Sequence, residues 1–183
     1  FFKLSHAQWS MHRMITDKTV SPFDFARKAK EWGFEGIEYV SQLYADELAK
    51  YDNDIEGMKG VVAQLKKESE LAGVENLLIM IDEEGDLSNS EEAIRDEAVE
   101  NHKKWIDAAE FLGCSAVRVN LQGSHDSEIW KKNAKIALSQ LASYAKPKNI
   151  NVIVENHGGF SSNAALLTAV IREVAMDNCG TLP

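Results

Sequence analysis

The sequence predicts an α/β protein in which short parallel strands alternate with amphipathic helices, and three observations predict this fold class. Gly33, Gly73 and Gly113 stand 40 residues apart, and each closes a segment with helical periodicity. Each glycine is followed within a few residues by an apolar strand. Most of these strands end in polar side chains. A repeat of this length is typical of right-handed βα crossovers in a parallel sheet.

The strands can be placed from runs of apolar and β-branched residues. A first strand is expected within residues 1–9, and Asn149 takes the place of glycine at the fourth helix-to-strand junction. The later strands are expected at 36–40, 76–81, 116–120 and 150–155, with the start of a sixth at 180–183.

The helices are marked by capping residues and apolar stripes. Ser21 caps the first helix and Pro22 opens it, while Ser88 and Glu91 form a capping-box pattern for the third. The fourth helix is expected at 127–144 and the fifth at 163–174. Side chains expected to face the sheet are Met58, Val61, Val62, Leu65 and Leu71 in the second helix, Ile94, Ala98, Trp105, Ala109 and Leu112 in the third, and Ile136, Leu138 and Leu141 in the fourth.

The turn after the first strand favours a barrel over an open sheet. Nucleotide-binding open sheets normally carry a glycine-rich turn there, whereas this chain has the residues 9–13, Trp-Ser-Met-His-Arg. Polar groups at the strand ends suit a site ringed by strands. The sequence therefore predicts a (βα)8 TIM barrel, of which residues 1–183, as one domain, cover about the first five βα units and the start of strand six.

Composition limits the class of partner and the location. Hydrophobic residues make up 44% of the chain and charged residues 27%, as in globular proteins. The net charge of −9 disfavours nucleic acid and anionic membrane surfaces, and no apolar run is long enough to span a bilayer. Cys114 and Cys179 are expected to be small core residues. The cytoplasm is the default location, although a chain that opens on Phe1 is compatible with removal of a leader.

Residues 152–159, Val-Ile-Val-Glu-Asn-His-Gly-Gly, are the most informative segment. Three β-branched residues predict a buried strand, and a carboxylate, an amide and an imidazole follow before two glycines that permit a turn. Active sites of α/β folds are built at such carboxyl ends, so Glu155 is the leading candidate for a functional residue. The alternative is a strand that ends in ordinary polar loop residues.

The order of these motifs resembles that of the xylose isomerase-like sugar isomerases and epimerases over the whole chain. The matching segments are 8–10 (Gln-Trp-Ser), 33–38 (Gly-Phe-Glu-Gly-Ile-Glu), 117–120 (Val-Arg-Val-Asn) and 154–157 (Val-Glu-Asn-His). The resemblance implies a barrel with one divalent metal ion, Mg, Mn, Co or Zn, at its carboxyl end. It implies that Glu155 is both a metal ligand and a catalytic proton shuttle, with the remaining ligands expected beyond Pro183.

The function implied is isomerisation or epimerisation of a sugar or sugar phosphate through an enediolate, which a carboxylate and a metal ion are suited to promote. The alternatives are an inosose-type dehydratase or an abasic-site endonuclease on the same fold, or a non-catalytic barrel if the native chain ends at Pro183. The partner expected is a small molecule. Whether the protein is a monomer or a homo-oligomer stays open.

Other polar residues at strand ends are candidates for substrate binding. Arg118 lies within an apolar strand and needs a partner, either a substrate or a structural ion pair with Glu38 or Glu155. Several others carry weaker expectations. His6 and Gln122 are less favoured pocket residues, and His102 and His125 are expected to be structural or exposed. The acidic run 82–86 is interpreted as a solvated loop, with a place in the rim around the substrate as the alternative. The substrate-binding candidates are Glu38, Arg118, Asn120, His157, Trp9 and His12.

Overall fold

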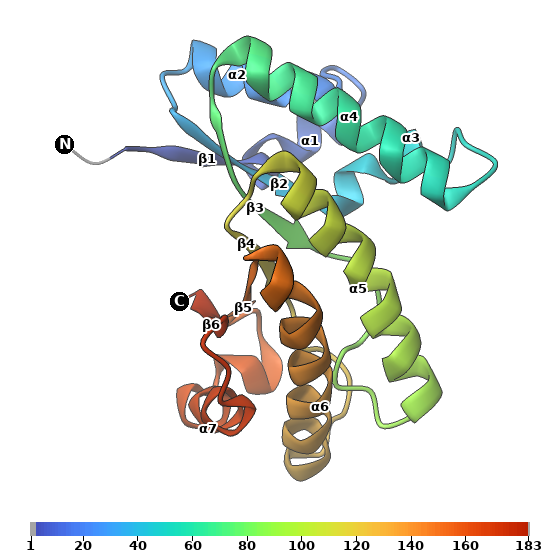
Figure 1. Ribbon diagram of the computed structural model, residues 1–183, viewed down its shortest axis with the longest axis vertical. Helices are drawn as coiled ribbons and strands as arrows, with labels where there is room; N and C mark the ends of the chain where they lie inside the picture. The colour runs from blue at the N-terminus through green and yellow to red at the C-terminus, as the bar shows by residue number, and fades with distance from the viewer. Residues whose placement is uncertain (1–2, 183) are drawn as a thin grey trace.

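The computed structural model describes residues 3–182, and within them six parallel strands form one sheet in sequential order. Figure 1 shows the helices following one another along one side of these strands. The strands are β1 (Ser5–Ala7), β2 (Gly36–Val40), β3 (Glu75–Ile81), β4 (Ala116–Val119), β5 (Asn151–Glu155) and β6 (Cys179–Leu182). Sequential parallel order with helices on one side is the arrangement of a (βα)8 barrel, here with six of its strands.

The described residues form seven α-helices, of which five occupy the positions that the repeat predicted, whereas the short helices at 12–16 and 45–48 were not predicted. The seven helices are α1 (His12–Thr16), α2 (Phe25–Glu31), α3 (Ala45–Leu48), α4 (Asp54–Ala72), α5 (Glu92–Leu112), α6 (Ser127–Ala145) and α7 (Ala164–Val174). Short 3-10 turns complete the connections at Gln8–Met11, Pro22–Asp24, Ser41–Tyr44, Lys146–Lys148 and Gly159–Ser162.

The helix ends explain the glycine repeat. Gly73 and Gly113 adopt left-handed conformations with φ of 64° and 81°, and Asn149 does the same with φ of 57° before β5. Glycine has no Cβ to clash in this region, and asparagine is the side chain that tolerates it best. At the amino-terminal end of the Pro22–Asp24 turn, Ser21 accepts a hydrogen bond from the Phe23 backbone, as predicted.

The capping box predicted for α5 is wrong. The helix begins at Glu92 after Glu91, and no side chain caps its first turn. Ser88 instead forms an isolated parallel bridge with Gly123, which joins the loop after β3 to the loop after β4. The Ser88 hydroxyl donates to the Gln122 carbonyl at 2.6 Å, so it is not available to cap the helix.

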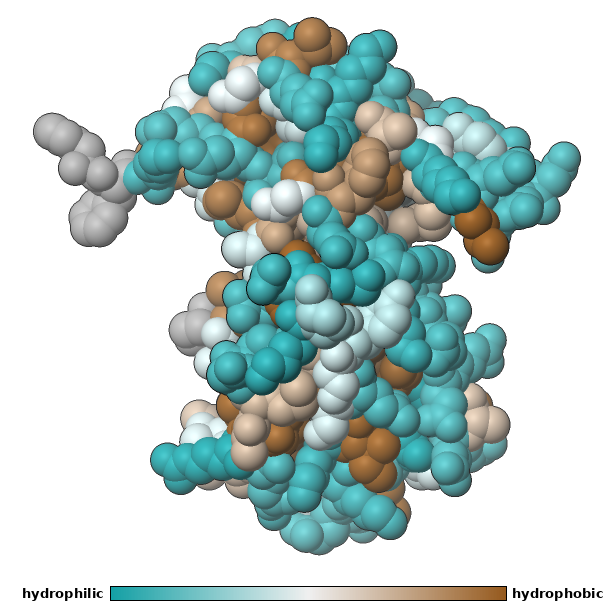
Figure 2. Space-filling view, viewed as in Figure 1, coloured by the Kyte–Doolittle hydropathy of each residue, from teal (hydrophilic) through white to brown (hydrophobic). Residues whose placement is uncertain are grey.

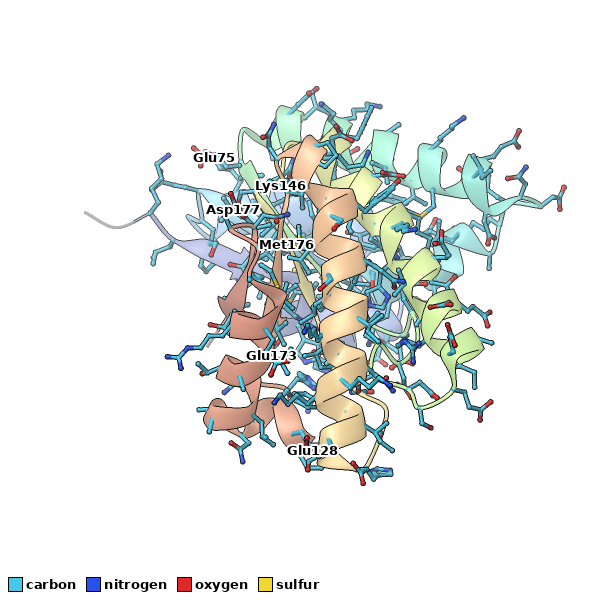
Figure 3. All side chains as sticks on the ribbon, turned by 60° about the horizontal axis from the view of Figure 1, so that its bottom comes forward. Glu75, Glu128, Lys146, Glu173, Met176 and Asp177 are labelled. Atoms are coloured by element: carbon cyan, nitrogen blue, oxygen red, sulfur yellow. The ribbon has the colours of Figure 1, made fainter. Side chains whose placement is uncertain are left out.

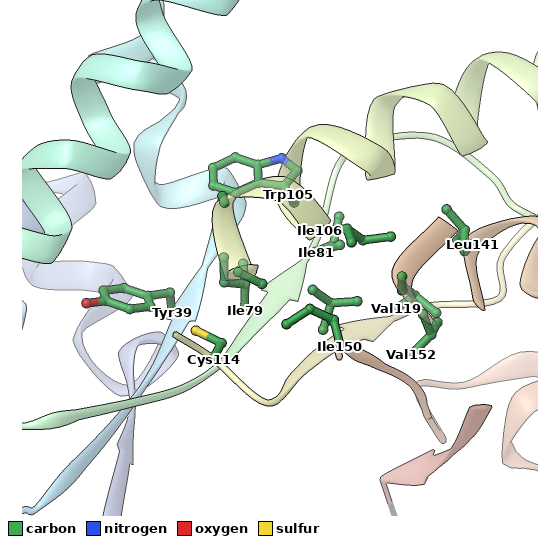
Figure 4. Packing of buried hydrophobic residues seen from close by; sticks show 14 of the residues in the cluster. Tyr39, Ile79, Ile81, Trp105, Ile106, Cys114, Val119, Leu141, Ile150 and Val152 are labelled. Atoms are coloured by element: carbon green, nitrogen blue, oxygen red, sulfur yellow. The ribbon is translucent and has the colours of Figure 1, made fainter. Parts of the chain in front are cut away.

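The core lies between the sheet and the helices. Trp105 and Ile106 of α5 are at most 1% exposed and belong to the same core cluster as Ile79 and Ile81 of β3 (Figure 4). Burial of a side chain of this size stabilises the fold by roughly 1.5–3 kcal/mol. Cys114, which is labelled among them, and Cys179 are both free and buried, as predicted. We call this side of the sheet its outer face.

Two predicted core positions, Leu71 in α4 and Ile94 in α5, are wrong, because the buried stripe of each helix is one turn shorter than predicted. Leu71 is 74% exposed, since it lies two residues beyond buried Ser69 and therefore points roughly 200° around α4. Ile94 is 41% exposed at the start of α5, whereas Ala98, Trp105 and Ala109 are buried. Figure 2 shows such apolar side chains scattered over a largely hydrophilic surface.

Ion pairs join the last two helices from outside. Lys131 of α6 lies 2.9 Å from Glu173 of α7, and Lys146 lies 2.9 Å from Asp177. Glu173, Lys146 and Asp177 are labelled in Figure 3. These side chains lie at the surface, where solvent and salt weaken an ion pair, so each pair contributes little to stability. No helix of the described chain is long and apolar enough to cross a bilayer.

Candidate functional site

The inner face of the sheet, opposite the outer face, leads to a polar cavity at the carboxyl ends of the strands. A small apolar group lies on this face, consisting of Val40, Leu78, Met80 and Ala116. Continuing along each strand in steps of two reaches polar residues, because side chains alternate between faces. The cavity has a volume of about 870 Å³, and its polar walls include Glu38, Asp82, His102, Arg118, Asn120, Gln122, Glu155 and His157.

Arg118 lies at the centre of this group. It stands in β4, paired in register with Met80 on one side and Ile153 on the other, and is only 4% exposed. Its Nη1 and Nη2 donate hydrogen bonds to the two oxygens of Asp82, at 2.7 Å and 3.3 Å. A buried guanidinium is stable only with such partners, and the two-pronged geometry fixes the plane of the group.

Glu155 ends β5 and meets the same guanidinium from the other side. Its Oε2 lies 2.8 Å from Arg118 Nε, and 31% of its side chain is exposed. The N–H of Nε does not point at this oxygen, because Arg118 Nε is buried without a hydrogen-bond partner. The contact is therefore an ion pair without a well-aligned hydrogen bond. Of the partners that the sequence suggested for Arg118, the structure brings Glu155 to it rather than Glu38.

Asp82 was not predicted as a site residue, and the interpretation of residues 82–86 as a solvated loop is only partly right, because Glu83 and Gly85 are exposed but Asp82 and Glu84 are not. The Asp82 side chain is 15% exposed and that of Glu84 is 14% exposed. Glu84 is held by Lys104 and by the indole nitrogen of Trp105. The alternation that places Leu78 and Met80 on the inner face also places Asp82 there, and this signal was available in the sequence.

Asn120 follows β4 and shares the carboxylate of Asp82. Its Nδ2 donates to Asp82 Oδ1 at 2.7 Å, so the amide is oriented by a group that can only accept when ionised. Its Oδ1 is buried and has no donor. Gln122 is exposed at the cavity wall. Asn120 therefore presents an unused acceptor beside the Arg118 ion pairs.

The predicted residues near the first two strands divide into two groups. Glu38 lines the cavity and accepts a hydrogen bond from Ser5 Oγ at 2.6 Å, and Trp9 lines it with 45% of its surface exposed. His12 is not part of the described cavity wall; its ring stacks on Trp9 with centroids 4.4 Å apart. His6 likewise packs away from the described wall, against Phe34 at 4.4 Å.

The remaining histidines show what sequence periodicity can miss. His157 is exposed and lines the cavity, and His125 is exposed, as predicted. His102 is structural in that it is 2% exposed, yet it also lines the cavity. Its Nδ1 lies 2.7 Å from the Ala98 carbonyl oxygen, and burial lowers the pKa of the imidazole. A mid-helix position gave no sign that this ring reaches the cavity.

A metal ion would find few donors among these residues. Within residues 3–182, no group of three or more His, Cys, Asp or Glu side chains is arranged to hold one. Glu155 offers a carboxylate, but one of its oxygens lies 2.8 Å from Arg118 Nε, which leaves the other oxygen as its donor for a second cation. The donors of the described chain therefore do not fit a complete metal centre.

Comparison with known proteins assigns the chain to a family. Residues 26–183 match the family described as xylose isomerase-like TIM barrel. The sequence has no significant match among the curated proteins.

Several solved structures are similar. The IolI protein with a binding zinc atom is 16% identical with a TM-score of 0.74, and the match covers 98% of this chain and 62% of that one. D-psicose 3-epimerase in the presence of D-fructose is 16% identical with a TM-score of 0.70, and the match covers 89% of this chain and 57% of that one. The probable 3-DHS dehydratase AsbF from Bacillus anthracis is 18% identical with a TM-score of 0.69, and the match covers 98% of this chain and 62% of that one. This chain thus spans less than two thirds of each, and these likenesses show a shared fold.

Proposed function

Because this chain belongs to the xylose isomerase-like TIM barrel family, we propose that its cavity isomerises or epimerises a small sugar or sugar phosphate by proton transfer. The observation that carries the proposal is the placement of Arg118 between Asp82 and Glu155, which brings a base and a fixed positive charge to one polar cavity. Residues 1–183 are part of a single barrel domain in this proposal.

Glu155 is the proposed catalytic residue. Its carboxylate takes a proton from the carbon next to the substrate carbonyl, and the electron pair of the broken C–H bond moves into an enediolate. Returning the proton to the other carbon, while the hydroxyl proton moves from one oxygen of the enediolate to the other, isomerises the sugar. Protonation of the same carbon from the opposite face, by a second acid on that side, epimerises it. Arg118 lies close enough to stabilise the negative oxygen that develops, since fixed charges act strongly where water is excluded.

The other cavity residues are proposed to bind the substrate. The unused acceptor of Asn120 suits a sugar hydroxyl, and Glu38 and His157 line the same cavity. The exposed face of Trp9 suits the apolar side of a sugar ring. His12 is proposed to act indirectly, by holding the Trp9 ring in place through the stacking contact between the two rings.

A divalent metal ion, Mg, Mn, Co or Zn, is part of the proposal as a requirement of the whole protein. In it, Glu155 supplies one ligand, and the others come from residues outside the described chain. The support is the family and the zinc-bound IolI protein. Its test is direct: Mn²⁺ titrated into the full-length protein should bind near one ion per chain, and Glu155→Gln should weaken that binding.

Similar solved structures suggest the substrate class. D-psicose 3-epimerase and 3-keto-D-glucoside 4-epimerase, the latter from E. coli, carry names of enzymes that act on sugars. Dehydration is the second candidate, since the AsbF structure is similar over 98% of this chain. The net charge of −9 argues against an abasic-site endonuclease.

The test is hydrogen exchange at carbon. The full-length protein is incubated with D-fructose, D-psicose and related ketoses in D2O with each metal, and NMR detects deuterium at the carbon next to the carbonyl. Glu155→Gln should lower the exchange rate about 100-fold or more. Glu75→Gln, which removes an exposed carboxylate paired with Lys3, serves as the control and should change nothing. A product that has lost water would favour the dehydratase, and full activity of Glu155→Gln would exclude Glu155 as the base.

A further inference from the structure

Asp82 has no part in the proton transfer proposed above, yet it accepts three hydrogen bonds within the cavity wall. We propose that Asp82 is a positioning residue: it holds Arg118 and Asn120 in the orientations that leave Glu155 free to react. This inference rests on the proposed function, because it assigns a purpose to Asp82 within that same site.

The geometry begins with the limited number of donors on Arg118. A guanidinium has five N–H groups in one plane, on its two terminal nitrogens and on Nε. Asp82 takes both terminal nitrogens, at 2.7 Å and 3.3 Å, which turns the Nε edge toward Glu155. Because the guanidinium is planar and Arg118 is only 4% exposed, this two-point contact fixes the orientation of the whole group.

The charges show why Asp82 matters to Glu155. One positive group lies between two carboxylates, and Asp82 holds the stronger, hydrogen-bonded contact. Glu155 feels the charge at 2.8 Å but does not receive an aligned N–H, so its lone pairs remain available. Without Asp82, the buried guanidinium would need another anion, and Glu155 is the one already beside it. A two-pronged contact with Glu155 would occupy both of its oxygens.

Asn120 is oriented by the same carboxylate. An ionised Asp82 can only accept, so it selects the amino group of the amide and turns the Asn120 oxygen away from itself. That oxygen is the buried acceptor without a donor. Loss of the Asp82 charge would remove the reason for this orientation and allow the amide to rotate. A single side chain thus sets both a charge and an acceptor in the cavity.

The test compares Asp82→Asn with Asp107→Asn in the full-length protein. Asp107 is a matched control because, like Asp82, it combines one cationic partner with one neutral donor, here Lys148 at 3.0 Å and the hydroxyl of Tyr144, but on the outside of α5. Asp82→Asn should lower kcat about 10- to 100-fold with KM changed much less, as a displaced catalytic group does. Asp107→Asn should leave both constants unchanged. If Asp82→Asn only lowers the melting temperature, with kcat per folded molecule unchanged, the proposal is wrong.

Two further measurements separate positioning from the proposed reaction. In an Arg118→Met background, Asp82→Asn should have little additional effect on kcat, since Asp82 acts chiefly through Arg118; an undiminished effect there would overturn the proposal. A crystal structure of Asp82→Asn, or of Asp82→Ala, should show the terminal nitrogens of Arg118 on Glu155. If Arg118 has not moved in that structure, the positioning proposal is wrong, whatever the activity of the natural protein. The proposed function has a separate refutation, which is that the natural protein turns over no sugar.

Discussion

Gly123 lies against the backbone of Ser88, and the two residues join the loop after β3 to the loop after β4. The Ser88 nitrogen donates to the Gln122 carbonyl at 2.9 Å, and the Ser124 nitrogen donates to the Ser88 carbonyl at 3.1 Å. Gly123 has φ of 139°, and a Cβ at this position would lie 2.4 Å from the Ser88 carbonyl carbon. The bridge thus fixes two loops that border the cavity and requires glycine.

Replacing this glycine should separate the loops. Gly123→Ala adds a methyl group that meets backbone atoms rather than a flexible side chain, so it should cost about 3 kcal/mol or more of unfolding free energy. The measurement is urea unfolding. Gly33→Ala is the control, because its φ of 88° is also in the region that favours glycine but no atom lies within 4 Å of the added methyl. Its cost should stay near 1–2 kcal/mol. Equal losses would show that steric contact with Ser88 is unimportant.

Removing Arg118 should destabilise the protein because two carboxylates lose their shared cation. Arg118→Met keeps much of the side-chain volume but leaves Asp82 with Asn120 as a remaining donor and Glu155 without an ion pair. We expect a loss of about 3–5 kcal/mol in urea unfolding at pH 7.

The control for this prediction is an exposed ion pair. Lys131→Met removes the contact with Glu173, whose side chain is 41% exposed, and should lower the unfolding free energy much less than Arg118→Met does. If Arg118→Met is no more costly than Lys131→Met, the buried network does not stabilise the fold. Loss of substrate binding without loss of stability would instead assign Arg118 to binding alone.

The buried imidazole of His102 should make stability depend on pH. Burial lowers the pKa of His102, with the Ala98 carbonyl and Glu84 opposing that shift. The unfolded chain binds the proton near pH 6.5 while the folded chain does not, so the stabilising contribution is present above about pH 6.5 and is lost as the pH falls. The slope reaches at most about 1.4 kcal/mol per pH unit for one proton.

The comparison that isolates this effect is the natural protein against His102→Gln. Unfolding free energy measured from pH 7.5 to 5.5 should fall more steeply for the natural protein. His6, whose pKa is also lowered by burial, is present in both proteins and cancels from the difference. Parallel curves would mean that His102 takes up its proton equally in both states.

Sequence patterns predicted the repeat, the strands and the two central residues of the site. Arg118 and Glu155 were recognisable because a charge within or directly after an apolar strand has few alternatives to a cavity or an ion pair. Asp82 was missed because it opens an acidic run that resembles a solvated loop, although its alternation with Met80 places it inward.

His102 and Ser88 show why the rest required the structure. His102 reaches the cavity from a helix, and helical periodicity predicts only that a ring faces inward, not what lies beyond it. Ser88 fitted a capping pattern, but its Oγ donates to Gln122 at 2.6 Å, a partner 34 residues away. Contacts between distant loops depend on how the strands stack, and no local pattern encodes that.

Strand β4 makes the chain sensitive to changes in length. Val117 and Val119 lie in the core between sheet and helices, while Arg118 between them reaches the cavity. A single-residue insertion or deletion between Gly113 and Ala116 that shifted the register would turn the arginine into the apolar core and the valines into the cavity. Such a shift would disrupt both the core and the cavity. The number of residues between Gly113 and Ala116 therefore matters as much as their identity.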